Sequence, residues 1–164
     1  MGGIVLRPFA ASDRRTLVGF AEALQDNERA LHASRRPGKE VSRAYVDDLL
    51  KNVIGKRGMI AIAERDGVPV AFVACWAESE NDPLLRGPHR TVVQVTDVYI
   101  VPEERGRGLA RRLLAAAEEH ARQLGIGRLL IGALAANEMA IAAYRRYGFQ
   151  PYEILFEKPV EPGP

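Results

Sequence analysis

The stretch PEERGRGLARRLL, residues 102–114, joins an apolar, strand-like run to an amphipathic helix pattern. At this junction the sequence carries two glycines, Gly106 and Gly108, and four arginines, Arg105, Arg107, Arg111 and Arg112. A helix N-terminus already has partial positive charge, so cations are normally disfavoured there. The same helix end binds anions through its free N–H groups, and glycines let a ligand approach the backbone closely. The stretch therefore predicts a phosphate-binding site.

Two common phosphate-binding fingerprints do not fit this turn. The phosphate loop of NTPases needs Lys and then Ser or Thr after its last glycine, whereas Gly108 is followed by Leu109 and Ala110. The dinucleotide fingerprint needs a third glycine where Arg111 stands, and an acidic residue about 20 positions further on, where Arg128 stands. The turn therefore belongs to neither class of nucleotide-binding protein.

A third pattern does fit. The run Arg105 to Ala110 reads R-x-x-G-x-A and resembles the acetyl-CoA signature of the GNAT N-acetyltransferase superfamily. Downstream, NEMAIAAYRRYGF (137–149) resembles the family's N-x-x-A-x-x-x-Y-x-x-x-G-F element. The order of elements is also similar to the family from Ile4 to Lys158. The resemblance implies one GNAT domain over residues 1–158, followed by a flexible tail over 159–164.

The periodicity of apolar residues predicts the elements around the turn. We expect strands over residues 4–7, 59–64, 68–77, 91–101, 128–134 and 149–158. We expect helices over residues 11–31, 41–55, 109–124 and 138–147. The fold class is therefore mixed α/β, with a mostly antiparallel sheet, one parallel strand–helix–strand step and helices on both faces.

The resemblance implies where acetyl-CoA binds as co-substrate. In the family the two parallel strands splay apart and the pantetheine arm lies between them. Backbone groups of Val98, Tyr99 and Ile100 would then pair with the pantetheine, and Asn137 would contact it from the far side. The pyrophosphate would lie on the turn, held by Arg105, Gly106, Arg107, Gly108, Leu109, Ala110 and Arg111. The sequence does not distinguish acetyl from a longer acyl group.

Two residues are candidates for the chemistry. The resemblance implies that Tyr144 is the general acid that protonates the departing thiolate; the alternative is that it only packs its helix against the sheet. Asp97 lies within a predicted strand, an unfavourable place for a bare carboxylate. It could be the base for the amine, an anchor for the substrate or a structural hydrogen-bond partner. Thr96 stands where some polyamine-acetylating relatives have an acidic residue, which argues against a polyamine.

The acceptor amine is not identified by the sequence. Arg35 and Arg36 would suit an anionic amine, whereas Glu78 and its acidic neighbours in the 79–90 loop would suit a cationic one. Trp76 could line the acceptor pocket or fill the core. The acceptor could be a small molecule or an amine of a protein. The alternative function is a coenzyme A-binding sensor that keeps the fold without acetyl transfer.

The composition restricts the remaining possibilities. The chain has 164 residues and a formal net charge of +2, too small to indicate nucleic-acid binding. Its single cysteine, Cys75, and three scattered histidines predict no metal site and no covalent intermediate. Neither a secretion signal nor a membrane span is apparent, so we expect a cytoplasmic protein. The resemblance also allows a homodimer.

Overall fold

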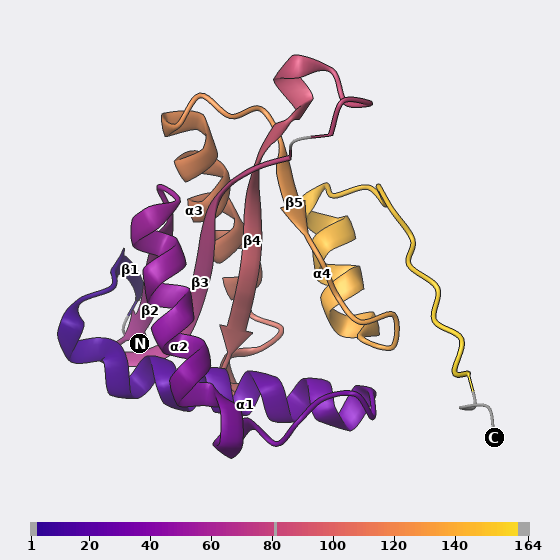
Figure 1. Ribbon diagram of the computed structural model, residues 1–164. Coiled ribbons are helices and arrows are strands. Elements are labelled where there is room, and N and C mark those ends of the chain that lie inside the picture. Colours follow the sequence, from indigo (N-terminus) through magenta and orange to yellow (C-terminus); the bar gives the residue numbers. More distant parts are fainter. Residues whose placement is uncertain (1–2, 81, 161–164) are drawn as a thin grey trace.

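In the computed structural model, which describes residues 3–80 and 82–160, five strands form one sheet in the order β1-β2-β3-β4-β5 (Figure 1). The first three neighbouring pairs are antiparallel and the last pair, β4–β5, is parallel. The expected mixed sheet is thus confirmed. The strands are β1 Ile4–Pro8, β2 Met59–Arg65, β3 Val68–Ser79, β4 Thr91–Ile100 and β5 Leu129–Ile131.

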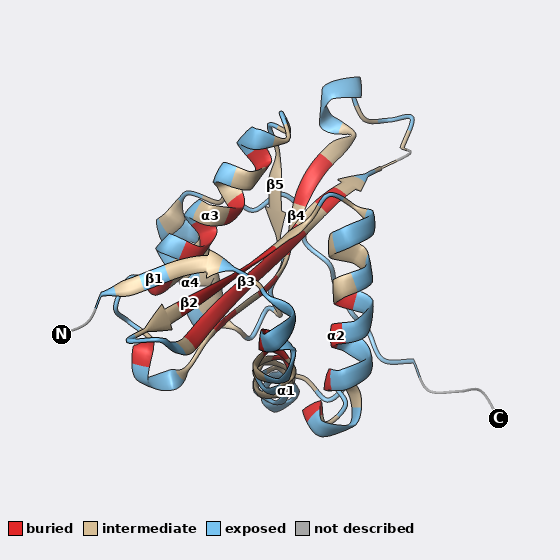
Figure 2. Ribbon diagram, turned by 90° about the vertical axis from the view of Figure 1, so that its left-hand side faces the viewer, coloured by how far each residue is buried: buried red, intermediate tan, exposed pale blue. Residues whose placement is uncertain are grey.

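Helices cover both faces of the sheet, as predicted (Figures 1 and 2). Helices α1 (Arg14–Leu31) and α2 (Gly38–Gly55) lie on one face, and α3 (Leu109–Gln123) and α4 (Glu138–Tyr147) lie on the other. Three short 3-10 turns complete the described elements: Ala11–Asp13, Gly87–His89 and Pro102–Glu104.

The central strand β3 divides the core into two clusters. Alternate side chains of a strand point to opposite faces of the sheet. Val73 and Cys75 therefore pack with Leu113 of α3, whereas Phe72 packs with Leu17 of α1 on the other face. Burial raises the pKa of the Cys75 thiol to about 12, so this cysteine stays a neutral, buried thiol.

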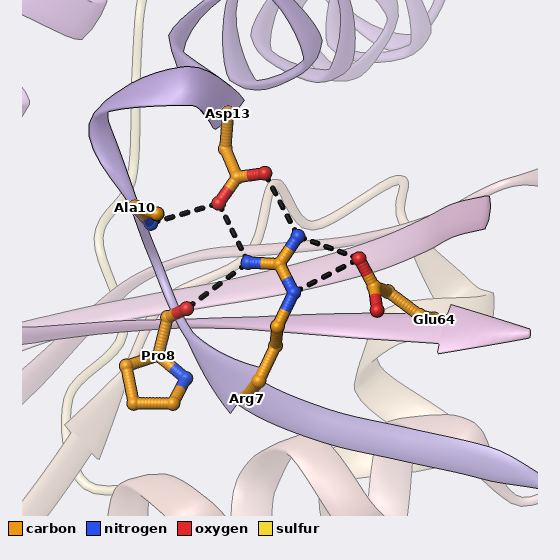
Figure 3. A network of polar contacts seen from close by, with 5 residues as sticks. All are labelled: Arg7, Pro8, Ala10, Asp13 and Glu64. Atoms are coloured by element: carbon orange, nitrogen blue, oxygen red, sulfur yellow. Dashed lines mark hydrogen bonds and ion pairs between the residues drawn. The ribbon is translucent and has the colours of Figure 1, made fainter. Parts of the chain in front are cut away.

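An ion-pair network fixes the start of α1 to the sheet (Figure 3). The guanidinium of Arg7 on β1 donates to both carboxylate oxygens of Asp13, at 2.6 and 2.8 Å, and to Glu64 on β2. Asp13 also accepts the backbone N–H of Ala10, and the Arg7 guanidinium lowers the pKa of the Asp13 carboxyl. The network sets the direction in which α1 leaves the sheet and crosses its face.

Three sequence predictions need correction. The first helix begins as a 3-10 turn and becomes α-helical only at Arg14, and β5 is confined to Leu129–Ile131. The strand predicted over 149–158 is wrong, because these residues lie in no helix or strand. A strand forms only by pairing with another strand, and residues 149–158 do not pair with the outer edge of β5. The segment is instead tethered by Tyr152 against Arg128 and by Glu157 against His32.

The end of the chain is only partly described. Residues 161–164 of the predicted tail lie outside the described residues. Before them, Ile154, Leu155 and Phe156 are exposed and run outside the sheet, past α4 (Figure 1).

Candidate functional site

The site begins where β4 and β5 separate. The two parallel strands pair at only three positions, ending at Val95 with Ile131, whereas β4 continues to Ile100. On its other side β4 remains paired with β3 as far as Ile100, with a bulge at Thr96. The edge of β4 over residues 96–100 therefore faces away from β3 with no strand beside it in the described chain. An extended ligand could occupy this position with backbone hydrogen bonds.

The glycine turn follows directly at the end of β4. Gly106 and Gly108 have φ angles of +74° and +79°, the left-handed region that favours glycine. Gly108 is the N-cap of α3, so it has no side chain to cap the helix. The first N–H groups of α3 have no partner within a helix, and the helix dipole adds to their attraction for anions. The turn is thus built to hold an anionic group against the backbone.

The four arginines of the turn have different positions. Arg105 donates from Nε to the carbonyl of Ile100, 3.0 Å away, and lines the pocket described below together with Arg111. Arg107 is mostly exposed, with Nη1 3.8 Å from the carboxylate of Glu104. Arg112 instead donates to the carbonyl of Ile4 on β1. Arg112 therefore ties α3 to the sheet edge, whereas Arg105 and Arg111 lie where an anion would bind.

A buried ion pair supports the turn from beneath. Glu104, 7% exposed, accepts from both Nε and Nη2 of Arg65 on β2, at 2.6 and 2.7 Å. The Arg65 guanidinium lowers the pKa of the Glu104 carboxyl. Because Glu104 immediately precedes Arg105, this contact anchors the entry of the turn to the sheet.

One pocket brings most of the predicted site together. A cavity of about 950 Å³ is lined by residues from β4, the turn, the start of α3, the length of α4, and the second half of α1. It contains Tyr144 and every predicted cofactor contact except Arg107. These contacts are Val98, Tyr99, Ile100, Arg105, Gly106, Gly108, Leu109, Ala110, Arg111 and Asn137.

Helix α4 carries Asn137 and Tyr144 into this pocket. Asn137 is the N-cap of α4, and its side-chain oxygen accepts the backbone N–H of Ala140 at 3.1 Å, as its position in the sequence predicts. Tyr144 lies two turns further along and packs edge-on against Phe149. Burial and the nearby carboxylates of Glu28 and Asp97 raise the pKa of Tyr144 to about 12. Its hydroxyl therefore keeps its proton at neutral pH.

Asp97 is buried beside the pocket rather than in its lining. The residue is 3% exposed, and the hydroxyl of Tyr45 on α2 lies 2.9 Å from each of its carboxylate oxygens. Burial raises the pKa of Asp97 to about 6, although hydrogen bonds from Tyr45 and Thr96 favour the charged form. The carboxylate is thus ionised at neutral pH and is close to titrating in the physiological range.

The residues proposed from the sequence for the acceptor are not brought together. Arg36 pairs with Glu40 on the exposed side of α2. Glu78 accepts from Trp76 at 2.7 Å and from Lys56 at 2.5 Å, and neither Trp76 nor Glu78 lines the cavity. Arg35 pairs with a residue that the sequence had not indicated, Glu28, at 3.2 Å.

The contribution of α1 to the pocket was missed from the sequence. Leu24, Asn27, Glu28 and Leu31 follow the three-and-four spacing of one helix face, and all four line the cavity. This face continues the apolar stripe that begins at Leu17. The two polar residues on it, Asn27 and Glu28, were therefore the signal available in the sequence. A polar pair within a stripe that packs on the sheet indicates a place where the helix faces a cavity.

Neither a metal centre nor a membrane span is found in the described part of the chain. Residues 3–80 and 82–160 contain no group of three His, Cys, Asp or Glu side chains that could hold a metal ion. None of the helices described there combines the length and apolar character needed to cross a bilayer.

The comparisons with known proteins agree with this geometry. The family model described as "Acetyltransferase (GNAT) family" matches residues 29–149. An uncharacterized N-acetyltransferase of Methanocaldococcus jannaschii is 32% identical over 99 residues, which cover 57% of this chain and 40% of that protein. The chain thus spans about 40% of the length of this curated relative.

Solved structures share the fold. A predicted acetyltransferase from Clostridium acetobutylicum, solved with acetyl-CoA, has a TM-score of 0.71 at 21% identity, with 96% of each chain covered. The aminoglycoside N-acetyltransferase AAC(6')-Iy, solved with CoA, has a TM-score of 0.72 at 17% identity, with 97% of this chain and 96% of that one covered. The family match covers both the glycine turn and the Asn137–Phe149 element, and this chain belongs to the acetyltransferase (GNAT) family.

Proposed function

We propose that this protein is an N-acetyltransferase that transfers an acetyl group from acetyl-CoA to a primary amine by direct attack. The observation that carries the proposal is the shared cavity, in which the free edge of β4, the glycine turn and the Tyr144 hydroxyl meet. A long ligand with a phosphate at one end and an extended amide-containing arm fits this arrangement. The thioester of acetyl-CoA would supply the activated acetyl group.

The chain's own groups have distinct tasks in this proposal. The N–H groups of Leu109 and Ala110, with Arg105 and Arg111, hold the phosphates. The free edge of β4 orients the arm so that the thioester lies near Tyr144. The neutral amine forms a C–N bond with the thioester carbonyl carbon, and the C–S bond breaks. Tyr144 gives its proton to the departing sulfur, and the proton that the amine loses passes through a water to Asp97, because Asp97 does not itself line the cavity.

Binding of acetyl-CoA is tested by thermal unfolding. A ligand that binds only the folded state stabilises it by about 2.7 kcal/mol at 100 times its Kd. We expect acetyl-CoA to raise Tm in a concentration-dependent way, and ATP or NAD at the same concentration to leave Tm unchanged. A Tm that acetyl-CoA does not move would contradict the proposal and the coenzyme A-sensor alternative together. Consumption of acetyl-CoA with a panel of amines then separates the enzyme from the sensor.

Gly108→Ala tests whether the turn holds the phosphates. Alanine at this φ costs about 1–2 kcal/mol of stability. Gly125, at the other end of α3 with φ +70°, is a matched control, because an added Cβ at either glycine meets no atom within 4 Å. We expect both variants to lose similar stability, whereas only Gly108→Ala raises the Kd for CoA by about tenfold or more, measured by calorimetry. Equal Kd values in the two variants would place the phosphates elsewhere.

A further inference from the structure

Glu28 is an acidic side chain in the pocket for which the proposed transfer reaction has no use. It lines the same cavity as Tyr144, and its side chain is 28% exposed. Glu28 lies close to the C-terminal end of α1 (Arg14–Leu31). On α1 the cavity is also lined by Leu24, Asn27, Ala30 and Leu31. A partly buried carboxylate among these residues must be offset by a favourable interaction.

The charges around Glu28 make this end of the site acidic. Its carboxylate acts on three neighbouring groups: it contributes to raising the pKa of Asp97, of Tyr45 and of Tyr144, in each case after burial as the main cause. Arg35 is the cation that faces these groups, so two carboxylates are opposed by one guanidinium. The turn at the other end carries Arg105 and Arg111. The pocket thus has arginines at the turn, whereas Glu28 and the buried Asp97 lie near Tyr144; Arg146 of α4 is a further basic residue of the lining.

Arg35 is poorly suited to bind an acceptor carboxylate. Its side chain is 40% exposed, and its Nε already pairs with Glu28 at 3.2 Å. An anionic acceptor would have to compete with Glu28 for this guanidinium. Since an exposed ion pair contributes little, an ammonium group could instead displace Arg35 from Glu28 at small cost.

We propose that Glu28 determines acceptor specificity by binding a second, non-reacting cationic group of the amine, so that the acceptors are small amines with two or more positive charges. This inference rests on the proposed acetyl transfer and names its substrate class. Arg35 then acts against binding, because it occupies Glu28 when the acceptor is absent. The second cationic group is thus recognised by a carboxylate on α1, and not by an acidic residue at the position of Thr96 on β4.

Three primary amines with the same three-methylene chain test the inference: 1,3-diaminopropane, butylamine and 4-aminobutanoate differ only in a far ammonium, methyl or carboxylate group. We expect kcat/KM to be highest for the diamine, by about tenfold over butylamine, the ratio that one charge-assisted hydrogen bond supplies. Glu28→Gln should remove this preference by lowering kcat/KM for the diamine far more than kcat/KM for butylamine. Arg35→Gln should increase the preference for the diamine over butylamine. An anionic acceptor site would give the opposite sign for Arg35→Gln.

A binding measurement separates this inference from the transfer proposal. The Kd of 1,3-diaminopropane for the protein–CoA complex is measured by calorimetry, with Glu22→Gln as a control that changes an α1 carboxylate outside the cavity lining. A Kd raised by Glu28→Gln but not by Glu22→Gln supports the inference even if no acetyl group is transferred. Equal Kd values in the wild type and Glu28→Gln, or tighter binding of 4-aminobutanoate than of the diamine, would overturn it even if butylamine is acetylated.

Discussion

Replacement of Tyr144 by phenylalanine is expected to lower kcat by about 10²- to 10⁴-fold, the usual contribution of a positioned general acid. The substitution removes only the hydroxyl, and the ring keeps its edge-on contact with Phe149. Because the pKa of Tyr144 is raised to about 12, the hydroxyl is protonated at every pH where the protein is assayed. Its loss leaves the thiolate to depart unprotonated. The Kd for CoA should change by less than about threefold, since the phosphates bind at the other end of the pocket.

Tyr147 provides a matched control for this variant. It lies on the same helix and lines the same pocket, and its pKa is also raised to about 12. Its hydroxyl, however, donates to Glu118 on α3 and is held by that contact. We therefore expect Tyr147→Phe to retain most of kcat in an acetyl-CoA consumption assay. If Tyr144→Phe retains kcat as well, Tyr144 has only the packing role, and the sulfur is protonated by another group or by water.

The backbone geometry of the proposed donor end could be predicted because it depends on local backbone rules. A glycine turn between a strand and a helix requires left-handed φ angles at Gly106 and Gly108, and both have them. Asn137 caps α4 through a hydrogen bond only three residues away. Such features are fixed by neighbours in the sequence, so a pattern of a few residues is sufficient to place them.

The acceptor end could not be predicted because it depends on which distant elements meet. Glu28 and Tyr144 line one cavity because α1 crosses the face of the sheet, and the polar pair Asn27 and Glu28 in the sequence indicates a cavity but not which element lies across it. Arg36 and Glu78 were chosen because they lie in or next to predicted loops, but Glu78 lies on β3, and in the folded chain each pairs with a neighbouring charge. The strand predicted over 149–158 failed for the same reason, since a strand forms only by pairing with another strand, which the local sequence does not determine.

Replacement of Asp97 by asparagine is expected to lower kcat by about 10²-fold or more, in the range typical of a general base. In the wild type, kcat should fall as the pH drops below about 6, the pKa of the buried carboxyl, because the protonated form accepts no proton. The profile is measured for kcat, since titration of the free amine would dominate kcat/KM. Tyr45→Phe removes a hydrogen bond that favours the charged carboxylate, so the acidic limb should move to higher pH. If the acidic limb of the kcat profile does not move in Tyr45→Phe, the limb reports the titration of a group other than Asp97.

Asp97→Asn should also stabilise the folded chain at neutral pH. Replacing a carboxylate that only holds the structure together would instead destabilise it. The folded-state pKa of about 6 lies above the ordinary value of 3.8, so between these values the folded state binds more protons than the unfolded state. Stability therefore decreases as pH rises through this interval, by on the order of 1–3 kcal/mol for one such group. Asparagine does not titrate and still accepts the Tyr45 hydroxyl. Urea unfolding should thus show Asp97→Asn gaining stability over the wild type at pH 7.5 relative to pH 4, while its activity is lost. A variant that loses stability at both pH values would instead assign Asp97 to holding β4 and α2 together.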